Sequence, residues 1–259
     1  MWYRSSIASA VLIGTIAGSG CFHSRTPSQV SEEDSTRSRA EALVRWGITW
    51  AAAGDWDQAI AGFTEALQVD PEFTPALAYR ARTWERKGEW EKAIDDYSAA
   101  IARLPDNQEM SIERRNVWAR HGKWDRVIED YSAVIEERPN DRYAWNNRAW
   151  VLATCPDTRF RDGARAVADA TRACELSDYS DGVILDTLAA AYAENRQFNK
   201  AIEIQTLAIR DRQFQLFHGK EARERLADYQ VNKPYREEPA ALFHWPEKRE
   251  VQDALPGTK

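Results

Sequence analysis

Three arginines and three aspartates recur at regular spacing in this chain. The arginines stand 34 residues apart, and an aspartate follows each of them by 16 or 21 residues. Where Trp46 replaces the arginine, Gly62 replaces the aspartate. Leu188 and Ile204 form a second joint replacement. Because the two charges occur together or not at all, we predict three structural ion pairs between helices, namely Arg80–Asp96, Arg114–Asp130 and Arg148–Asp169.

The other polar residues do not form a catalytic or cofactor-binding motif. The four histidines are scattered, without a His-Glu-x-x-His pair, and no Gly-x-x-x-x-Gly-Lys loop is present. The densest group of polar residues between two predicted helices consists of Asp157, Arg159, Arg161 and Asp162. The only nucleophile near it is Cys155. We therefore predict a protein that is not an enzyme, with no metal site, no cofactor and no small-molecule substrate.

Cys155 and Cys174 are two thiols within the predicted folded part. In an exported protein two such thiols can be oxidised to a disulfide. If Cys155 ends one helix and Cys174 lies near the far end of the antiparallel next helix, their Cα atoms lie beyond the limit of about 7 Å for a disulfide. We expect two packing residues, and a disulfide is the alternative if the long intervening turn shifts the second helix.

The chain repeats itself every 34 residues in five aligned sets. These are Trp50, Trp84 and Trp118; Gly54, Gly88 and Gly122; Trp56, Trp90 and Trp124; Phe63, Tyr97 and Tyr131; and Pro71, Pro105 and Pro139. In the first unit Ala59, Phe63 and Ala66 lie on one helical face. The glycines mark the end of a first helix, and the prolines follow a second helix that proline cannot continue. The pattern predicts a series of helix–turn–helix units.

This repeat resembles the tetratricopeptide repeat family, whose period is 34 residues. The resemblance implies an all-α, right-handed solenoid of about five helix-turn-helix repeats with a C-terminal capping helix. The solenoid is predicted over residues 39–230, and its capping helix from about Gln213 to Tyr229. The fourth unit departs from the period, because the turn after Cys155 holds five additional residues.

In this family the first helices line the inner, concave face, which commonly holds an extended peptide or a partner helix. Here that face is expected to carry guanidinium and amide groups, which suit a carboxylate and a peptide backbone. The candidate partner-binding residues are Arg82, Arg86, Asn116, Arg120, Asn146 and Trp150. Trp150 lies outside the packing sets, and an exposed tryptophan is a usual anchor for a partner. A solvated helical face without a binding role is the alternative.

Arg115 stands where other units have glycine or alanine. We expect its long side chain to extend out of a crowded helix contact toward solvent. An orientation toward the inner face is the alternative.

The N-terminus has the layout of an export signal, with Arg4, an apolar stretch over residues 7–17 and small residues before Cys21. Ser19-Gly20-Cys21 resembles the lipobox of bacterial lipoproteins, although Gly18 departs from that motif. The resemblance implies that residues 1–21 are a signal peptide, that Cys21 is acylated, and that it anchors an exported protein facing the periplasm or the cell exterior. An ordinary cleaved signal and an uncleaved anchor are alternatives.

Two segments flank the solenoid. Residues 22–38 are predicted to be a flexible tether, since they are polar and contain almost no apolar side chain that could form a core. Residues 231–259 are predicted to be an extended or disordered tail, since they combine prolines with mixed charge.

The composition limits the class of partner. The net charge of −6 lacks the basic footprint of a general nucleic-acid binder, so we predict no nucleic-acid partner. The predicted function is a membrane-tethered protein–protein interaction scaffold that binds a peptide or partner helix in the concave groove. The alternative is a structural or envelope-assembly lipoprotein that acts through its convex surface or by self-association.

Overall fold

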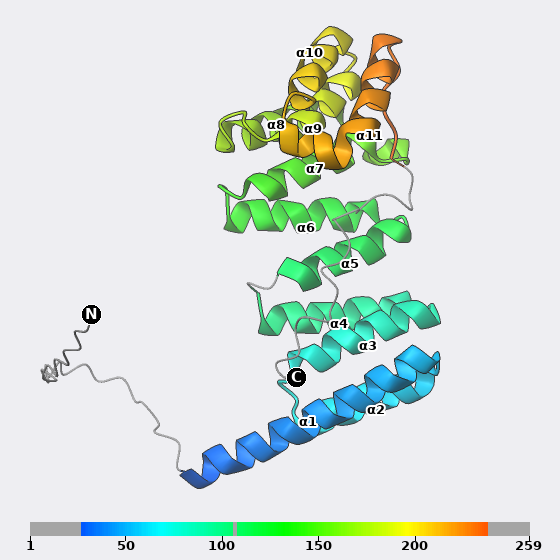
Figure 1. The fold of residues 1–259 in the computed structure, drawn as a ribbon, viewed down its shortest axis with the longest axis vertical. Helices are drawn as coiled ribbons and strands as arrows, with labels where there is room; N and C mark the ends of the chain where they lie inside the picture. Colours follow the sequence, from blue (N-terminus) through cyan, green and yellow to red (C-terminus); the bar gives the residue numbers. More distant parts are fainter. Residues whose placement is uncertain (1–26, 106–107, 238–259) are drawn as a thin grey trace, which may run out of the picture.

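The structure, a computed structural model, describes residues 27–105 and 108–237. Within these residues the chain forms eleven α-helices, one short 3-10 helix and no strand. The helices stack in layers along the long axis of the molecule (Figure 1). This confirms the predicted all-α solenoid of five helix-turn-helix units with a closing helix.

Successive helices pair within each unit. The pairs are α1 (Pro27–Ala53) with α2 (Trp56–Val69), α3 (Thr74–Lys87) with α4 (Trp90–Arg103), α5 (Gln108–Arg120) with α6 (Trp124–Glu137), α7 (Arg142–Thr154) with α8 (Gly163–Leu176), and α9 (Gly182–Glu194) with α10 (Phe198–Ala208). The closing helix is α11 (Arg212–Gln230), and a 3-10 helix, η1 (Thr158–Phe160), lies in the long turn of the fourth unit.

The turn inside a unit depends on one residue with left-handed backbone geometry. Gly54, Gly88 and Gly122 follow α1, α3 and α5 with φ of 80°, 88° and 67°. Glycine adopts this conformation without a steric penalty, and so ends the helix and reverses the chain. In the fifth unit Arg196 holds the corresponding position at φ 61°, where a side chain is disfavoured.

Small residues let the paired helices approach closely. One small residue near the start of each second helix is fully buried, and the set comprises Ala59, Ala93, Val127, Ala166 and Ala201. One turn later Phe63, Tyr97 and Tyr131 are buried in three separate apolar clusters. Each cluster joins neighbouring units, as expected of a solenoid in which repeats contact only their neighbours.

Each of the three arginines forms an ion pair with the aspartate predicted for it. Arg80 donates to both carboxylate oxygens of Asp96 at 2.8 and 2.7 Å. Arg148 donates to both oxygens of Asp169 at 2.7 and 2.8 Å, and both side chains are buried. Arg114 forms an ion pair with Asp130. These contacts join the first helix of a unit to the second helix of the same unit.

The same arginines also reach the preceding unit. Each donates to a hydroxyl on the second helix of that unit, at 2.9–3.0 Å, and the acceptors are Thr64, Ser98 and Ser132. These three hydroxyls are themselves spaced by 34 residues. Each arginine therefore holds three helices together, because its guanidinium has donors for two acceptors at once.

The two units without this ion pair use apolar contacts at the same position. In the first unit Trp46 lies against Gly62, where an added Cβ would come within 2.6 Å of the Trp46 ring. The tryptophan therefore requires glycine opposite it. In the fifth unit Leu188 is buried, and Ile204 packs against its cluster.

Arg115 corrects a sequence prediction, since it extends neither toward solvent nor along the inner face. Its Nη1 donates to the second oxygen of Asp130 at 2.6 Å, and its guanidinium lies 4.4 Å from the centre of the Tyr131 ring. The reason is that Arg114 bonds only one Asp130 oxygen, which leaves the other to a second donor.

The first helix also differs from the sequence prediction. α1 begins at Pro27, so much of the segment predicted as a flexible tether, residues 22–38, is helical. No glycine or proline interrupts the chain after Pro27 until residue 47, and Arg37 forms an ion pair with Asp70 at the end of α2, at 3.3 Å. A polar segment without helix-breaking residues can thus extend a packed helix.

The predicted signal peptide and Cys21 lie outside the described residues. In the ranges 27–105 and 108–237, none of the helices has the length and apolar character needed to cross a membrane.

Removing one partner of the buried ion pair should destabilise the protein strongly. We expect Asp169→Ala to cost about 3–5 kcal/mol, because Arg148 would remain buried and unpaired. The measurement is urea unfolding followed by circular dichroism.

The matched control is Glu129→Ala, whose pair with Arg126 is largely exposed. It should cost no more than about 0.5 kcal/mol. Equal costs for the two variants would contradict a structural role for the buried pair.

Candidate partner-binding face

Side chains from four first helices, α3, α5, α7 and α9, form what we call the first-helix face. We define it by Arg82, Glu85, Arg120, Trp150 and Glu194. At its α3–α5 part, Arg82 forms ion pairs with Glu109 at 2.6 Å and with Glu113 at 3.3 Å. Arg120 forms an ion pair with Glu85. Of the three cations that the sequence predicts for partner binding, Arg82 and Arg120 are therefore already paired with acids of α3 and α5.

Glu85 is the most constrained acid of this part. It accepts a hydrogen bond from the Tyr97 hydroxyl at 2.7 Å. Burial raises the pKa of its carboxyl above the usual range, although the Tyr97 hydrogen bond and the Arg120 charge act in the opposite direction. Because Arg82 and Arg120 both have acidic partners, this part of the face does not offer two free cations for the carboxylate of a partner.

The structure separates the other sequence-predicted residues. Arg86 is exposed at the end of α3, whereas Asn116 is half-buried and its Oδ1 has no hydrogen-bond partner in the part of the chain that the structure describes. Asn146 is buried, and its Nδ2 donates to Asn147 at 3.2 Å. The expectation that Asn146 is available at the surface is therefore wrong, because α7 turns it into the helix packing.

Trp150 is covered by the chain itself. After α11 the chain returns to the first-helix face, and we call residues Tyr235, Arg236 and Glu237 the docked segment. The Trp150 and Tyr235 ring centres lie 5.9 Å apart, and Trp150 Nε1 donates to the Glu237 carboxylate at 3.0 Å. The expectation that Trp150 is an open anchor is corrected, since part of the segment that the sequence assigns to an extended or disordered tail contacts its ring.

The docked segment also makes backbone contacts with α7. The Glu237 backbone N–H donates to the Thr154 carbonyl at 3.0 Å, and Arg236 Nη1 donates to the Ala153 carbonyl at 3.4 Å. Both acceptors belong to the last turn of the helix, where carbonyls lack a partner within the helix. The end of α7 is therefore a ready acceptor site for an extended chain.

A buried ion pair between α9 and α11 lies next to the docked segment and contacts its tyrosine. Arg225 of α11 donates to both carboxylate oxygens of Asp186 in α9, at 3.0 and 2.8 Å. Gln205 of α10 adds a hydrogen bond to Asp186 at 2.6 Å. The Arg225 guanidinium lies 5.6 Å from the Trp150 ring centre and 5.3 Å from that of Tyr235, so it contacts both aromatic rings.

The turn of the fourth unit has a structural role. Asp157 caps η1 and pairs with Arg159, while Arg161 donates to the Cys155 carbonyl at 2.8 Å and pairs with Glu194 at 3.1 Å. Asp162 caps the start of α8. Each of the four charged residues of the turn therefore has a partner that explains its presence. The described residues contain no group of His, Cys, Asp and Glu side chains that could hold a metal ion.

Cys155 and Cys174 are free thiols, buried in two different apolar clusters. Burial raises the pKa of Cys155 to about 11 and that of Cys174 to about 12. Both are therefore poor nucleophiles near neutral pH.

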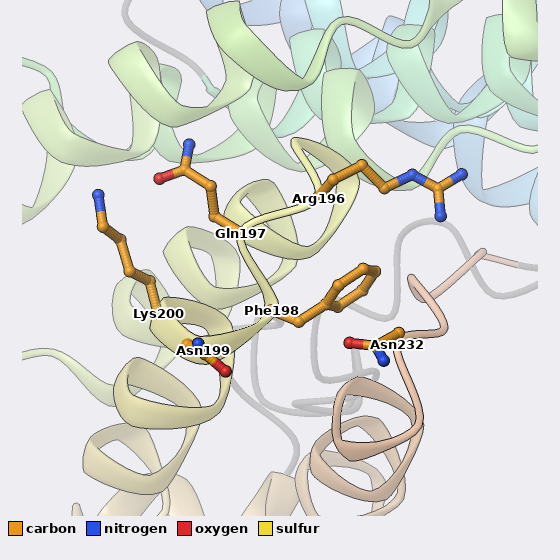
Figure 2. Close-up of a pocket in the computed structure, with 6 residues that line it drawn as sticks. All are labelled: Arg196, Gln197, Phe198, Asn199, Lys200 and Asn232. Carbon is orange, nitrogen blue, oxygen red and sulfur yellow. The ribbon is translucent and has the colours of Figure 1, made fainter.

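A shallow hollow of about 340 Å³ lies apart from the docked segment, where the α9–α10 turn meets the end of α11 (Figure 2). Its lining includes Arg196, Phe198, Lys200 and Asn232. The Lys200 ammonium contacts the Tyr192 ring at 5.2 Å, and the hollow has no acidic lining residue. Its polar side chains do not converge on one point in Figure 2, so the first-helix face is the better candidate site.

Comparison with known proteins identifies the repeat type. The tetratricopeptide repeat model matches residues 51–111. A solved tetratricopeptide repeat protein from Parabacteroides merdae is 16% identical, covers 75% of this chain and 77% of that chain, and has a TM-score of 0.55. Comparison with curated protein sequences gives no match.

Two further solved structures share the fold. The MamA protein is 13% identical over 69% of this chain and 94% of its own, with a TM-score of 0.51. The segment of MamA from Desulfovibrio magneticus that starts at its residue 41 is 14% identical over 68% and 97%, with a TM-score of 0.50. At such identities the likeness concerns the fold alone.

Slow modification of the buried thiols would test this part of the structure. At pH 8 a pKa of about 11 leaves roughly one Cys155 thiol in a thousand ionised, and a pKa of about 12 leaves roughly one Cys174 thiol in ten thousand. Iodoacetamide should therefore modify both thiols far more slowly in the native protein than in urea. The measurement is mass spectrometry of the peptides that contain each cysteine. Rapid native modification, or recovery of the two peptides as a disulfide, would contradict it.

Proposed function

We propose that the chain is a non-catalytic scaffold that binds an extended segment of a protein partner on its first-helix face. The match of a tetratricopeptide repeat model to residues 51–111 and the fold shared with a solved tetratricopeptide repeat protein support this proposal. One observation carries this proposal. The face between α7 and α9 already holds a segment that is neither helix nor strand, through side-chain contacts to Trp150 and through the carbonyls of Ala153 and Thr154. A surface that binds its own chain in this way has the groups needed to bind another.

The charges of the face support peptide binding. Arg82 and Arg120 are paired within the face, so an incoming chain need not neutralise isolated buried cations. Recognition would then depend on shape, on the Trp150 ring and on hydrogen bonds to the backbone. Arg86 remains as an exposed cation at the edge.

We also propose that the protein is exported and tethered to a membrane through acylated Cys21. The support is the Ser19-Gly20-Cys21 motif after an uncharged stretch. Only five residues separate Cys21 from the start of α1. A tether this short would hold the first repeat close to the membrane surface.

Self-association is a second candidate function, and one observation favours it. Leu216 and Phe217 lie side by side in the sequence on α11 and are 78% and 73% exposed. The closing helix of a solenoid is expected to present a polar outer side. Two large apolar side chains on that helix therefore suit a contact with a second copy.

The scaffold proposal predicts that partner capture depends on Trp150. We expect crosslinking in cells, followed by purification, to recover a partner with the native chain and to lose at least about tenfold of it with Trp150→Ala, because truncating a central tryptophan removes a hot-spot contact. Leu207→Ala, a change at an exposed residue of second helix α10, is the control and should leave capture unchanged.

Two results would contradict the scaffold proposal as stated. Equal capture of the partner by the native and Trp150→Ala chains would mean that the partner binds a surface other than the first-helix face. Crosslinks that join α11 of one copy to α11 of a second copy, without another protein, would favour self-association.

The tether proposal predicts the mass of the mature protein. Protein extracted from membranes should start at Cys21 and carry acyl chains, because one chain alone gives only marginal membrane binding. Intact-mass spectrometry makes this measurement. A chain that starts elsewhere, or an unmodified Cys21, would exclude the lipid anchor.

A further inference from the structure

The docked segment shows which side-chain chemistry the first-helix face accepts. Three consecutive residues, Tyr235, Arg236 and Glu237, each contact a different feature of the face. We infer that the partner is an extended peptide with an aromatic, a basic and an acidic residue in succession, and that the docked segment is the chain's own occupant of this site. This inference rests on the proposed function.

The aromatic position is defined by two rings and a cation. Tyr235 contacts the Trp150 ring and the Arg225 guanidinium, and it packs against the apolar cluster that contains Tyr229. An aromatic ring fits this position because its faces are attracted both to a second ring and to a cation. An aliphatic side chain would lose both interactions.

The basic position is defined by an acid and a carbonyl. Arg236 Nη2 lies 2.5 Å from the Glu194 carboxylate, while Nη1 reaches the Ala153 carbonyl. Glu194 also pairs with Arg161 at 3.1 Å and is half-buried. A planar guanidinium suits this arrangement, since its donors point toward two acceptors at once.

The acidic position is the most enclosed. Glu237 is 7% exposed, accepts a hydrogen bond from Trp150 Nε1 and donates its backbone N–H to the Thr154 carbonyl. Burial raises the pKa of its carboxyl, while the Arg225 charge and the Trp150 hydrogen bond oppose that shift. A buried acid is costly unless the site is arranged to receive it. The fit at Glu237 therefore indicates specific recognition.

The occupant can exchange because little else holds it. Residues 231–234 connect it to α11, and Val231, Asn232 and Lys233 are exposed. The helices beneath are packed with each other through their own buried residues. A short connection gives the occupant an effective concentration in the millimolar range, so a free peptide must compete against it.

The test compares the native full chain with a double variant, Tyr235→Ala with Glu237→Ala, which we call the loosened chain because its docked segment has lost two of its contacts. The probe is a fluorescent peptide with the sequence of residues 231–238, and its anisotropy reports binding. The loosened chain should bind the probe at least about tenfold more tightly than the native chain, since it lacks the competing occupant. A Lys233→Ala chain, altered at an exposed residue beside the docked segment, should bind like the native chain.

Two controls assign the binding to the site. Adding Trp150→Ala to the loosened chain should reduce probe affinity about tenfold or more, because the ring contact and the Nε1 hydrogen bond are both lost. A second peptide with the same residues in scrambled order should bind the loosened chain at least about tenfold more weakly than the probe. Circular dichroism of each chain verifies that it remains folded.

The outcomes separate this inference from the proposed function. If probe and scrambled peptide bind the loosened chain equally and Trp150→Ala weakens both, the face binds peptides but without this order of side chains, and the inference is overturned alone. If neither peptide binds the folded loosened chain, the inference and peptide binding on this face both fail. Equal binding of the probe to native and loosened chains would show that the docked segment does not occupy the peptide site.

Discussion

Burial of charge between the helices is the constraint on which the stacking of this solenoid depends. A guanidinium placed between three helices is costly unless a carboxylate meets it, and here each such arginine has an aspartate in its own unit and a hydroxyl in the preceding one. The contact therefore sets the spacing within a unit and between units together. It also explains why the residues at this position change in pairs, since Trp46 requires Gly62 and Leu188 packs with the cluster that includes Ile204.

The first helices also carry the candidate site, on the side that does not pack in the ion-pair layer. Their buried alanines and ion pairs fix the position of each first helix relative to its neighbours. That arrangement sets the positions of Trp150, Asp186 and Glu194. The face has paired charges along α3 and α5 and an aromatic site between α7 and α9. The proposed peptide binding would thereby be concentrated in the fourth unit, which has the longer turn, and in the fifth unit, which lacks the repeated ion pair.

Much of the fold could be predicted from the sequence because the signal for it is periodic. The 34-residue period is enough to place Arg80 opposite Asp96 and Arg114 opposite Asp130, and the five additional residues in the turn of the fourth unit account for the position of Asp169. The hydroxyls of Thr64, Ser98 and Ser132 also repeat every 34 residues, although their spacing alone does not show what they contact. The helical start of α1 and the docked segment have no periodic signal. Glu237 meets Trp150 across 87 residues, and no spacing in one sequence indicates such a contact. The buried Arg225–Asp186 pair is unpredictable for the same reason.

The return of the chain from α11 to α7 changes how the C-terminal part can unfold. In an open solenoid each unit contacts only its neighbours, and an end can fray one unit at a time. Here the docked segment joins the end of the chain to the fourth unit through Thr154 and to the fifth through Glu194. While this segment is docked, the fourth and fifth units and α11 form a closed set of contacts that must open together, whereas the first units have no such closure among the described residues. The molecule combines a cooperative C-terminal block with an N-terminal half that can loosen stepwise.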